Sequence, residues 1–466
     1  MGGGSSGGSG PALPYGIVST PDRGPRVGVL VGDRVLDLGG ALPAPGVAGA
    51  PEARGASGPP GPSGPLAAEP AWAGVDPSLF ARPSLNAFMA AGPDVWRRVR
   101  AALVGMAGDL ESGSGRQRSG LLAHLLPASE VTMHLPFEVA DYVDFYSSLD
   151  HATNLGRLFR PDAEPLLPNW RHLPAGYHGR SGTVVVSGTP VVRPCGQRRQ
   201  PGEAAPSFGP CRRLDVEAEV GFVVGVGSEL GRPVPVGAFA DHVFGVVLVN
   251  DWSARDIQAF EYVPLGPFLG KSFATSISAW VTPLAALDAA WVPGPTQEPP
   301  PLPYLSGRTP GSAPAPGPPP AHRPAPAPGT APAPGSPPGL GPRARPLGLD
   351  LALEVSLNDQ VLSRPPFAGT YWTPAQQLAH LTANGASLRT GDLYASGTVS
   401  GPEPDQLGSL IELTWNGTRP LHLADGSTRS FLEDGDTVTI TASAPAAGGG
   451  VLHLGPVTGT ITPALP

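Results

Sequence analysis

The sequence is poor in the features that mark secreted, membrane and nucleic-acid-binding proteins. Only two cysteines, Cys195 and Cys211, occur in 466 residues, and they form no metal-binding or redox motif. No apolar stretch approaches the roughly 20 residues that a membrane helix requires. The formal net charge of -8 is spread without long runs, which argues against a nucleic-acid backbone as the main partner. We therefore expect a cytoplasmic protein with no membrane or nucleic-acid partner.

Glycine and proline are instead abundant, with 64 and 62 residues. Much of the excess is local, because residues 306–346 are dominated by Pro, Ala and Gly, and positions 310–346 contain no Val, Ile, Phe, Trp or Tyr. Such a stretch cannot bury enough apolar surface to offset the entropy cost of ordering. We predict a disordered insertion over 306–346 and a flexible Gly/Ser lead over 1–12.

Residues 13–135 are predicted to form a small N-terminal domain. The segment 26–38 is expected to make two short strands joined by a Gly-Asp turn, which suits a tight hairpin. Helices over 85–91 and 93–106 are predicted to follow. This part of the chain contains no obvious group of reactive side chains.

Residues 136–466, apart from the insertion, are rich in predicted strands and form the second expected domain. Strands are predicted at 183–186, 190–193, 214–224, 243–249, 349–357, 411–415 and 438–441, with another around Phe431. The first two are expected to pair as a hairpin, and a Thr-Pro-Ala-Gln capping box at 373–376 is expected to start a helix. Short strands joined by Asn-Gly and Asp-Gly turns favour a mainly antiparallel β architecture over a βαβ repeat.

Chemically capable side chains gather between Asp251 and Thr275, directly after the apolar strand at 243–249. Where a buried strand ends, side chains reach the rim of the sheet and can meet a ligand. This rim carries an acid, a guanidinium, an amide, a phenol and an ammonium, namely Asp251, Arg255, Gln258, Tyr262 and Lys271. A loop that only connects two elements does not need this chemistry.

Glu217 and Glu219 are two positions apart on a predicted strand, so both carboxylates should leave the same face. One interpretation is a solvated strand face, which is the commoner case. The other is a divalent cation that offsets the repulsion between two buried carboxylates. Oxygen ligands favour Mg²⁺, Ca²⁺ or Mn²⁺ over Zn²⁺. Asp251 is the natural third ligand of such a site, and Asp144 is a possible fourth.

His151 is the candidate general base, because a neutral imidazole can take a proton from water near neutral pH. A histidine is more often a packing or surface residue than a catalyst, and the chain has 10 of them. The segment before His151, Asp-Phe-Tyr-Ser-Ser, sets it apart only through the resemblance to a known family that is described next.

These motifs resemble those of a known family. The runs Asn-Asp-Trp-Ser-Ala-Arg-Asp-Ile-Gln at 250–258 and Tyr-Val-Pro-Leu-Gly-Pro-Phe-Leu-Gly-Lys-Ser-Phe at 262–273 resemble the signature of the fumarylacetoacetate hydrolase family. The segment 141–188 is similar to that family almost residue by residue. The resemblance implies a mainly β (α+β) fold with a small SH3-like N-terminal barrel and a β-roll catalytic domain.

The resemblance also implies a role for each matched residue. The metal would be Mg²⁺ and/or Ca²⁺, and the positions at or around it are Asp144, Glu217, Glu219, Asp251, Lys271 and Thr275. The catalytic positions would be His151 as base, Glu412 as its orienting carboxylate, and Arg255, Gln258 and Lys271 as oxyanion partners. The substrate would be held by Tyr146, Arg160, Tyr177, Gln258, Tyr262 and Thr398.

Each role has a simpler alternative. Sequence alone would place Glu412 on the outward face of a strand. Arg160 and Arg255 could be surface ion pairs that contribute little to stability, and the tyrosines could be core residues with satisfied hydroxyls. The pair Leu149-Asp150 departs from the family pattern, and its added negative charge could raise the pKa of the adjacent base or disturb the surroundings of that base.

The resemblance implies a metal-dependent hydrolase that cleaves a carbon–carbon bond of 4-fumarylacetoacetate to give fumarate and acetoacetate. This reaction is the last step of tyrosine and phenylalanine breakdown. A homodimer is expected from the family alone. A related acylpyruvate hydrolase or oxaloacetate decarboxylase is an alternative, although such proteins typically lack the N-terminal domain. Another alternative is an adaptor that binds SH3 or WW domains through the Pro-rich insertion.

Overall fold

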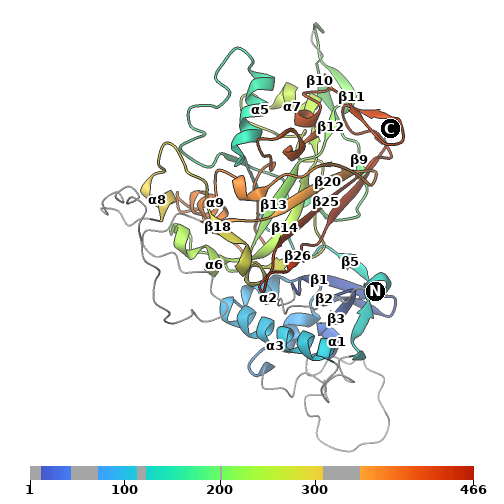
Figure 1. Ribbon diagram of the computed structural model, residues 1–466, viewed down its shortest axis with the longest axis vertical. Coiled ribbons are helices and arrows are strands. Elements are labelled where there is room, and N and C mark those ends of the chain that lie inside the picture. Colours follow the sequence, from blue (N-terminus) through green and yellow to red (C-terminus); the bar gives the residue numbers. More distant parts are fainter. Residues whose placement is uncertain (1–11, 43–71, 113–121, 200–201, 308–346, 466) are drawn as a thin grey trace, which may run out of the picture.

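The computed structural model describes residues 12–42, 72–112, 122–199, 202–307 and 347–465 (Figure 1). The predicted lead and insertion lie outside the described residues, except for residue 12 and residues 306 and 307. Within these ranges the chain is mostly strands with few helices, as the sequence predicted. No helix of the described chain is both long enough and apolar enough to cross a membrane.

The N-terminal part is an antiparallel sheet covered by helices. Its strand order is β4-β3-β2-β1-β5, where the strands are β1 Tyr15–Thr20, β2 Arg23–Val31, β3 Arg34–Asp37, β4 Leu125–Pro127 and β5 Thr132–His134. The helices are α1 Leu38–Ala41, α2 Asn86–Ala90 and α3 Pro93–Ser112. The predicted β2–β3 hairpin is confirmed, because Val31 pairs with Arg34 across Gly32, whose φ of 62° a glycine adopts without strain.

An eight-stranded mixed sheet forms the centre of the C-terminal part. Its order is β7-β6-β22-β13-β14-β16-β8, and β17 also pairs with β14. The strands are β6 Tyr142–Phe145, β7 Gly176–His178, β8 Val184–Val186, β13 Ala218–Val224, β14 Val243–Asp251, β16 Thr275–Ile277, β17 Thr282–Pro283 and β22 Leu393–Ala395. Every residue of β14 is buried, because this strand has a partner on both edges and is covered on both faces.

A six-stranded sheet packs beside the eight-stranded one. Its order is β21-β20-β25-β27-β9, and β26 also pairs with β25. The strands are β9 Val191–Val192, β20 Ala352–Leu357, β21 Gln360–Ser363, β25 Thr437–Pro445, β26 Val451–His453 and β27 Val457–Thr462. Alternate residues of β20 and β25 are buried, so each presents one apolar face to the shared core.

Short elements fill the space around these sheets. The helices are α5 Leu149–Phe159, α6 Phe239–His242, α7 Arg255–Glu261, α8 Pro303–Ser306, α9 Pro374–Leu381 and α10 Leu410–Leu413. The short strands are β10 Cys195–Arg198, β11 Ser207–Pro210, β12 Leu214–Asp215, β15 Ser253–Ala254, β18 Trp291–Pro293, β19 Leu347–Leu349, β23 Leu421–His422 and β24 Thr428–Arg429. The capping box predicted at 373–376 is present at the start of α9.

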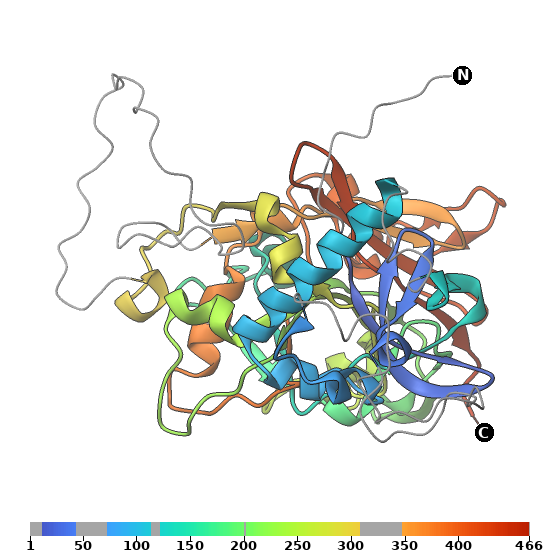
Figure 2. The ribbon, with the colours of Figure 1, turned by 90° about the horizontal axis from the view of Figure 1, so that it is seen from below.

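The two parts of the molecule pack on one another through a common apolar core. Tyr15 of β1 exchanges two backbone hydrogen bonds with Val281, at 2.9 and 2.8 Å. The ring of Phe244 on β14 lies 5.6 Å from the ring of Tyr15 and 5.5 Å from that of Phe88. Seen from below, α3 and β1–β3 lie in front of the C-terminal sheets (Figure 2). The N-terminal part is therefore seated against the start of β14.

Four strand predictions were wrong in detail. The segments 183–186 and 190–193 do not form a hairpin, because β8 pairs with β16 and β9 with β27 in different sheets. The predicted strand 214–224 breaks between β12 and β13. Residues 411–415 are not a strand, since α10 occupies Leu410–Leu413, and Phe431 lies outside any strand beside an isolated bridge at Leu432. Short irregular segments take their shape from tertiary contacts that local patterns do not contain.

Candidate metal and catalytic site

Four buried carboxylates that are far apart in the sequence meet at one rim of the eight-stranded sheet. Asp144 lies on β6, Glu217 directly before β13, Glu219 in β13, and Asp251 at the end of β14. One oxygen of each lies within 4.8 Å of the others. The pairing of β13 with β14 brings the last three together, and the Asp251 N–H donates to the Glu217 carbonyl at 3.2 Å. The alternative of a solvated strand face for Glu217 and Glu219 is wrong, since both are buried.

The electrostatics of this cluster are unbalanced. Burial and the adjacent Asp251 raise the pKa of Asp144 well above its ordinary value. The pKa of Glu219 is also raised well above its ordinary value. Burial is the largest cause, and the nearby carboxylates of Asp144 and Asp251 add to it. Burial also opposes the ionisation of Glu217, but Arg255, Lys271 and His151 outweigh it and lower the pKa of that carboxyl. The cationic side chains thus stabilise the charge on Glu217 more than that on Asp144 or Glu219.

The donor set fits a hard divalent cation. Both side-chain oxygens of Glu219 and Oδ1 of Asp144 are buried and have no hydrogen-bond partner among the described residues. A buried carboxylate without a partner is costly unless a cation takes that place. Four carboxylates that offer only oxygen suit Mg²⁺, Ca²⁺ or Mn²⁺.

Lys271 and two hydroxyls surround the cluster. The Lys271 ammonium donates to Glu217 Oε2, lies 2.5 Å from Asp251 Oδ2 and 4.0 Å from Asp144 Oδ2. Although burial favours its neutral form, Asp251 and Glu217 raise the pKa of Lys271, so it stays charged. Thr275 Oγ1 donates to Asp251 Oδ1 at 2.9 Å, and the Tyr177 hydroxyl donates to Asp251 Oδ2 at 3.2 Å. Lys271 is therefore a counter-charge beside the carboxylates.

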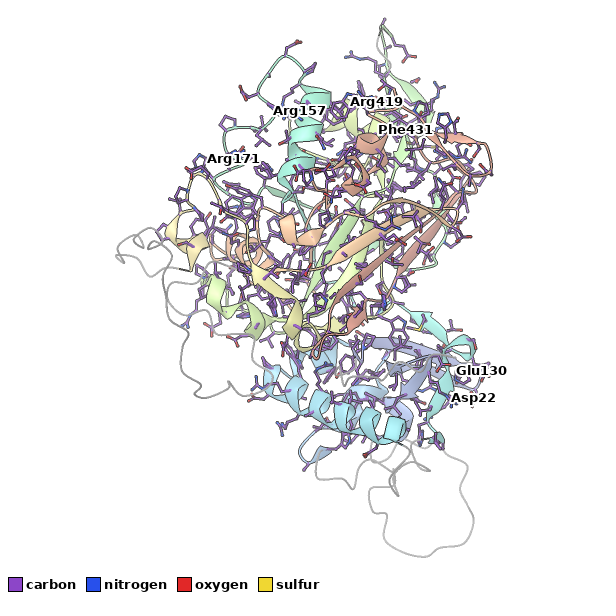
Figure 3. The ribbon with its side chains drawn as sticks, viewed as in Figure 1. Asp22, Glu130, Arg157, Arg171, Arg419 and Phe431 are labelled. Atoms are coloured by element: carbon purple, nitrogen blue, oxygen red, sulfur yellow. The ribbon has the colours of Figure 1, made fainter. Side chains whose placement is uncertain are left out.

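His151 lies next to the cluster at the beginning of α5. Ser148 caps the helix by accepting from the His151 N–H at 3.2 Å. Nδ1 of His151 lies 2.7 Å from Glu412 Oε2, and Nε2 lies 3.9 Å from Glu217 Oε1. The imidazole is buried, whereas Arg157 on the same helix points outward at the surface (Figure 3). The helix thus directs its first turn toward the carboxylates.

Glu412 is held by several donors. Asn154 Nδ2 donates to its Oε1 at 3.0 Å, and the hydroxyls of Ser400 and Ser409 donate to Oε2 at 2.9 and 2.7 Å. Burial opposes its ionisation, but His151 and these hydrogen bonds lower its pKa. Glu412 lies on α10 and is buried, so the alternative of an outward strand position is wrong. These three donors could not be predicted from the sequence, because Asn and Ser are too common to mark a site.

Arg255 is fixed by two carboxylates. Its Nε donates to Asp215 Oδ2 at 2.7 Å and its Nη2 to Glu217 Oε1 at 2.6 Å. The alternative of a surface ion pair is wrong, since Arg255 and Asp215 are both buried. Arg255 Nη1 also donates to Gln258 Oε1 at 3.3 Å. Asp215 was not predicted as a site residue, although it lies two positions before Glu217, the same spacing that relates Glu217 to Glu219.

The predicted substrate residues lie at different depths. Thr398 is buried, and its Oγ1 has no partner among the described residues. Tyr146 stands edge-on to His151, with ring centres 5.4 Å apart. Arg160 donates to the Pro165 carbonyl at 2.6 Å, which is a contact beside the helix end and not with the carboxylates. Tyr262 is 42% exposed and is not brought into the buried cluster.

Asp150, the departure noted beside the base, is half-buried in the first turn of α5. Burial and the adjacent Glu412 raise its pKa. Its carboxyl has no hydrogen bond to His151 among the described contacts. The extra acid therefore acts on the dyad through space and not through direct contact.

Comparison with known proteins covers both parts of the chain. The family described as "Fumarylacetoacetase N-terminal" matches residues 12–136, and "Fumarylacetoacetate (FAA) hydrolase C-terminal" matches residues 142–462. The fumarylacetoacetase of Homo sapiens is 40% identical over 460 residues, 97% of this chain and 96% of that protein. The Arabidopsis thaliana fumarylacetoacetase is 40% identical over 465 residues, covering 97% and 95%.

A similarity to solved structures accompanies these matches. A fumarylacetoacetate hydrolase from Exiguobacterium antarcticum superposes with a TM-score of 0.49 at 12% identity. The superposition covers 97% of this chain and 99% of that one.

Proposed function

The chain belongs to the fumarylacetoacetase family, since the two family patterns match most of it and relatives at 40% identity match nearly all of it; from this premise we propose that it hydrolyses a carbon–carbon bond of 4-fumarylacetoacetate. The products are fumarate and acetoacetate, and the reaction is the last step of tyrosine and phenylalanine breakdown. The observation that carries the proposal is the buried group of four carboxylates with the His151 imidazole 3.9 Å from one of them.

The carboxylates Asp144, Glu217, Glu219 and Asp251 hold a divalent cation in this proposal, Mg²⁺ or Ca²⁺ by preference. The unpartnered oxygens of Glu219 and Asp144 support this assignment. When bound, the cation polarises the two ketone oxygens of a β-diketone. Lys271 and Thr275 balance and orient the carboxylates through their contacts with Asp251.

His151 is the general base. Because a carboxylate can only accept a hydrogen bond, the 2.7 Å contact with Glu412 assigns the proton to Nδ1 and leaves the Nε2 lone pair free. Nε2 lies 3.9 Å from Glu217 Oε1, so a water that sits beside this contact can reach both atoms. One O–H bond of this water breaks, its proton passes to Nε2, and Glu412 stabilises the imidazolium that results.

The hydroxide oxygen then forms a bond to the ketone carbon beside the alkene. Arg255, Gln258 and Lys271 stabilise the resulting oxyanion, and the ion pairs of Arg255 with Asp215 and Glu217 keep its guanidinium in place. Collapse of the oxyanion breaks the carbon–carbon bond and leaves the electron pair on the acetoacetate fragment. The proton on Nε2 then passes to the carbon of the acetoacetate fragment that received the electron pair, and His151 is neutral again.

Five side chains are proposed to bind the substrate together with Gln258. Thr398 supports this with a buried hydroxyl that has no partner among the described residues, and Tyr146 supports it through its contact with His151. Two acidic ends on the substrate match a guanidinium and phenolic hydroxyls. The proposed set is Tyr146, Arg160, Tyr177, Tyr262 and Thr398.

We also propose a cytoplasmic homodimer built from an N-terminal domain at residues 13–135 and a catalytic domain at residues 136–466. The surface that supports a dimer is the uncharged run at 262–269, where Val263, Leu265 and Phe268 are 67%, 96% and 63% exposed. A contiguous apolar patch of this kind is typical of an interaction site. The mass in solution of wild type and Leu265→Asp tests this, and a monomeric wild type contradicts it.

Turnover of fumarylacetoacetate by wild type and His151→Ala, each with and without a chelator, tests the proposed function. The proposal requires wild-type turnover that the chelator abolishes and the substitution lowers strongly. An acylpyruvate and oxaloacetate serve as competing substrates in the same assay. Activity that survives both the substitution and the chelator contradicts the mechanism, and faster turnover of a competing substrate contradicts the assigned substrate.

A further inference from the structure

Four buried residues beside the carboxylate cluster form a closed ring of contacts. His151 Nδ1 lies 2.7 Å from Glu412 Oε2, and this oxygen accepts from the Ser400 hydroxyl at 2.9 Å. The Ser400 carbonyl accepts from the Ser148 hydroxyl at 2.9 Å, and the Ser148 oxygen accepts from the His151 N–H at 3.2 Å. The ring therefore returns to the residue at which it began.

The direction of each hydrogen bond that the two hydroxyls make is fixed by their partners. A backbone N–H can only donate, so the Ser148 oxygen accepts from His151 and its single proton is left for the Ser400 carbonyl. A carboxylate can only accept, so the proton of the Ser400 hydroxyl points to Glu412, while its oxygen accepts from the Gly408 N–H at 3.0 Å. Each hydroxyl thus uses both its proton and a lone pair, which holds it in one orientation.

Solvent has little access to the ring. Ser148, His151 and Glu412 are each 2% exposed, and Ser400 is 4% exposed. In such surroundings a polar group that loses its partner is left without a hydrogen bond, because water does not reach it easily. Removing either hydroxyl should therefore open the ring and leave the other members free to shift.

The ring joins two chain segments that are distant in the sequence. Ser148 lies between β6 and α5, and Ser400 lies after β22. The parallel pairing of β6 with β22 sets these segments side by side, and the Ser147 N–H donates to the Ser396 carbonyl at 3.2 Å. Gly397 permits the close approach, since its φ is 76° and a Cβ there would come within 3.0 Å of the backbone of the first segment.

The ring connects the helix of the proposed base with the carboxylate that contacts it. Ser148 caps α5, so the place of His151 in the first turn depends on Ser148. Ser400 holds Glu412, which lies on a different helix, α10. Asn154, one turn further along α5, also donates to Glu412, so His151 is held on both sides. The position of such a group matters, since a misplacement of about 1 Å can lower a rate by about 10²-fold.

We propose that Ser148 and Ser400 are positioning residues that act through this ring to keep Nδ1 of His151 on Glu412 and Nε2 beside the carboxylate cluster. This role rests on the proposed function of His151 as the base. Neither hydroxyl is required to gain or lose a proton, so the reaction steps given above are unchanged.

A kinetic double-mutant cycle tests the ring. Steady-state turnover of fumarylacetoacetate with saturating Mn²⁺ is measured for Ser148→Ala, Ser400→Ala and the double variant. Ser409→Ala is the matched comparison, alone and with Ser148→Ala, because Ser409 also donates to Glu412 but shares no hydrogen-bond partner with Ser148 among the described residues. Ser356→Ala, whose hydroxyl donates to a backbone carbonyl in the six-stranded sheet, controls for the loss of a serine in general.

Ser148→Ala and Ser400→Ala should each lower kcat by about tenfold or more and leave KM within about twofold of wild type, because the base shifts and the substrate contacts do not. Either substitution opens the ring, so the double variant should be within about twofold of the slower single variant. The losses of Ser148→Ala and Ser409→Ala should instead multiply. Ser356→Ala should keep wild-type kinetics.

The role of the two serines is overturned if both single variants keep the wild-type kcat, or if their losses multiply in the double variant, while His151→Ala is inactive. If His151→Ala keeps turnover, the proposed function fails as well. Thermal melts identify any variant that does not fold. Should the double variant be one of these, a crystal structure of a folded single variant decides, because an unchanged 2.7 Å contact between His151 and Glu412 contradicts the proposal.

Discussion

At the scale of single residues, Asp215 connects two functional groups of the site. It accepts from Arg255 Nε at 2.7 Å and from the backbone N–H groups of Leu410 and Ile411 at 2.7 and 3.2 Å. Those two N–H groups begin α10, the helix that carries Glu412. One carboxylate thus positions both Arg255, a proposed oxyanion partner, and Glu412, which is proposed to orient the base.

We predict that Asp215→Asn lowers both stability and turnover. The amide keeps the volume but removes the charge opposite a buried guanidinium, and losing one partner of a buried ion pair costs about 3 kcal/mol. Urea unfolding measures the loss. Asp434→Asn is the control, because its pair with Arg193 is partly exposed and should contribute less than about 1 kcal/mol. Equal effects of the two variants would show that Asp215 has no special role.

The dyad of His151 and Glu412 yields a second prediction. His151→Ala removes the proposed base and should lower kcat by about 10³-fold with little change in KM, because general-base catalysis contributes on this order. Glu412→Gln keeps an acceptor for Nδ1 but loses the charge that stabilises the imidazolium, so kcat should fall by a smaller factor. Steady-state kinetics with saturating metal separate the two. An unchanged kcat in His151→Ala would remove this residue from the mechanism.

Substitution of Glu219 is expected to stabilise the metal-free protein and to weaken metal binding. Because burial and the neighbouring acids raise its pKa, the ionised carboxyl is unfavourable without a cation. Glu219→Gln should therefore raise the melting temperature of chelated protein, yet weaken Mn²⁺ binding by at least about tenfold. Calorimetric titration and thermal melts measure both quantities. Glu229→Gln, at an exposed position, is the matched control. A variant that binds Mn²⁺ as tightly as wild type would exclude Glu219 as a ligand.

At the scale of elements, regular segments were predictable and irregular ones were not. The apolar run at 243–249 identified β14, and the capping box at 373–376 identified the start of α9, because each pattern is local. The break between β12 and β13 and the one-turn helix α10 have no such pattern. Their shapes depend on contacts with distant segments, such as the bridge between Glu217 and Ser409. Glu412 could therefore be assigned only through the family resemblance.

The turn before β25 supplies a pH-dependent prediction. The Asp436 carboxylate accepts from Arg429 Nε at 2.9 Å, from the Glu433 N–H at 2.8 Å and from Asn358 Nδ2 at 2.9 Å. Burial opposes its ionisation, but the hydrogen bonds from Arg429, Glu433 and Asn358 prevail and lower its pKa. A carboxyl with a lowered folded-state pKa adds stability above its unfolded pKa of about 3.9, and this is lost as the pH falls through the folded value.

Asp436→Asn should consequently cost roughly 2 kcal/mol at neutral pH, and the difference from wild type should shrink as the medium becomes acidic. Urea unfolding at a series of pH values measures this difference. Asp425→Asn, at an exposed turn, provides the comparison. A difference that stays constant down to the most acidic condition would contradict the assigned role.

At the scale of the whole molecule, the N-terminal part is integrated with the catalytic sheets. Tyr15 and Phe88 pack against Phe244 at the beginning of β14, the strand that ends in Asp251. The sequence predicted the two parts separately but not this contact, because apolar periodicity shows which face is buried and not which partner covers it. A shared core of this kind makes the N-terminal part a support for the strand that carries a proposed metal ligand.

The segment 308–346 lies outside the described residues, which resume at Leu347. A flexible Gly-Ser linker long enough to join Gly307 to Leu347 can take its place. All residues proposed to act on metal, water or substrate lie elsewhere in the chain.

Replacing 308–346 by such a linker should leave kcat and KM for fumarylacetoacetate within about twofold of wild type, because a hydrolase needs only the carboxylates, the dyad and the oxyanion partners. An adaptor acting through its Pro-rich segment makes the opposite prediction, since the ligand of SH3 or WW domains would be gone. Kinetics of the linker variant, alongside His151→Ala with the segment intact, separate the two. If the linker variant keeps full turnover and His151→Ala has none, the function lies in the folded site. The reverse result assigns the function to the Pro-rich segment.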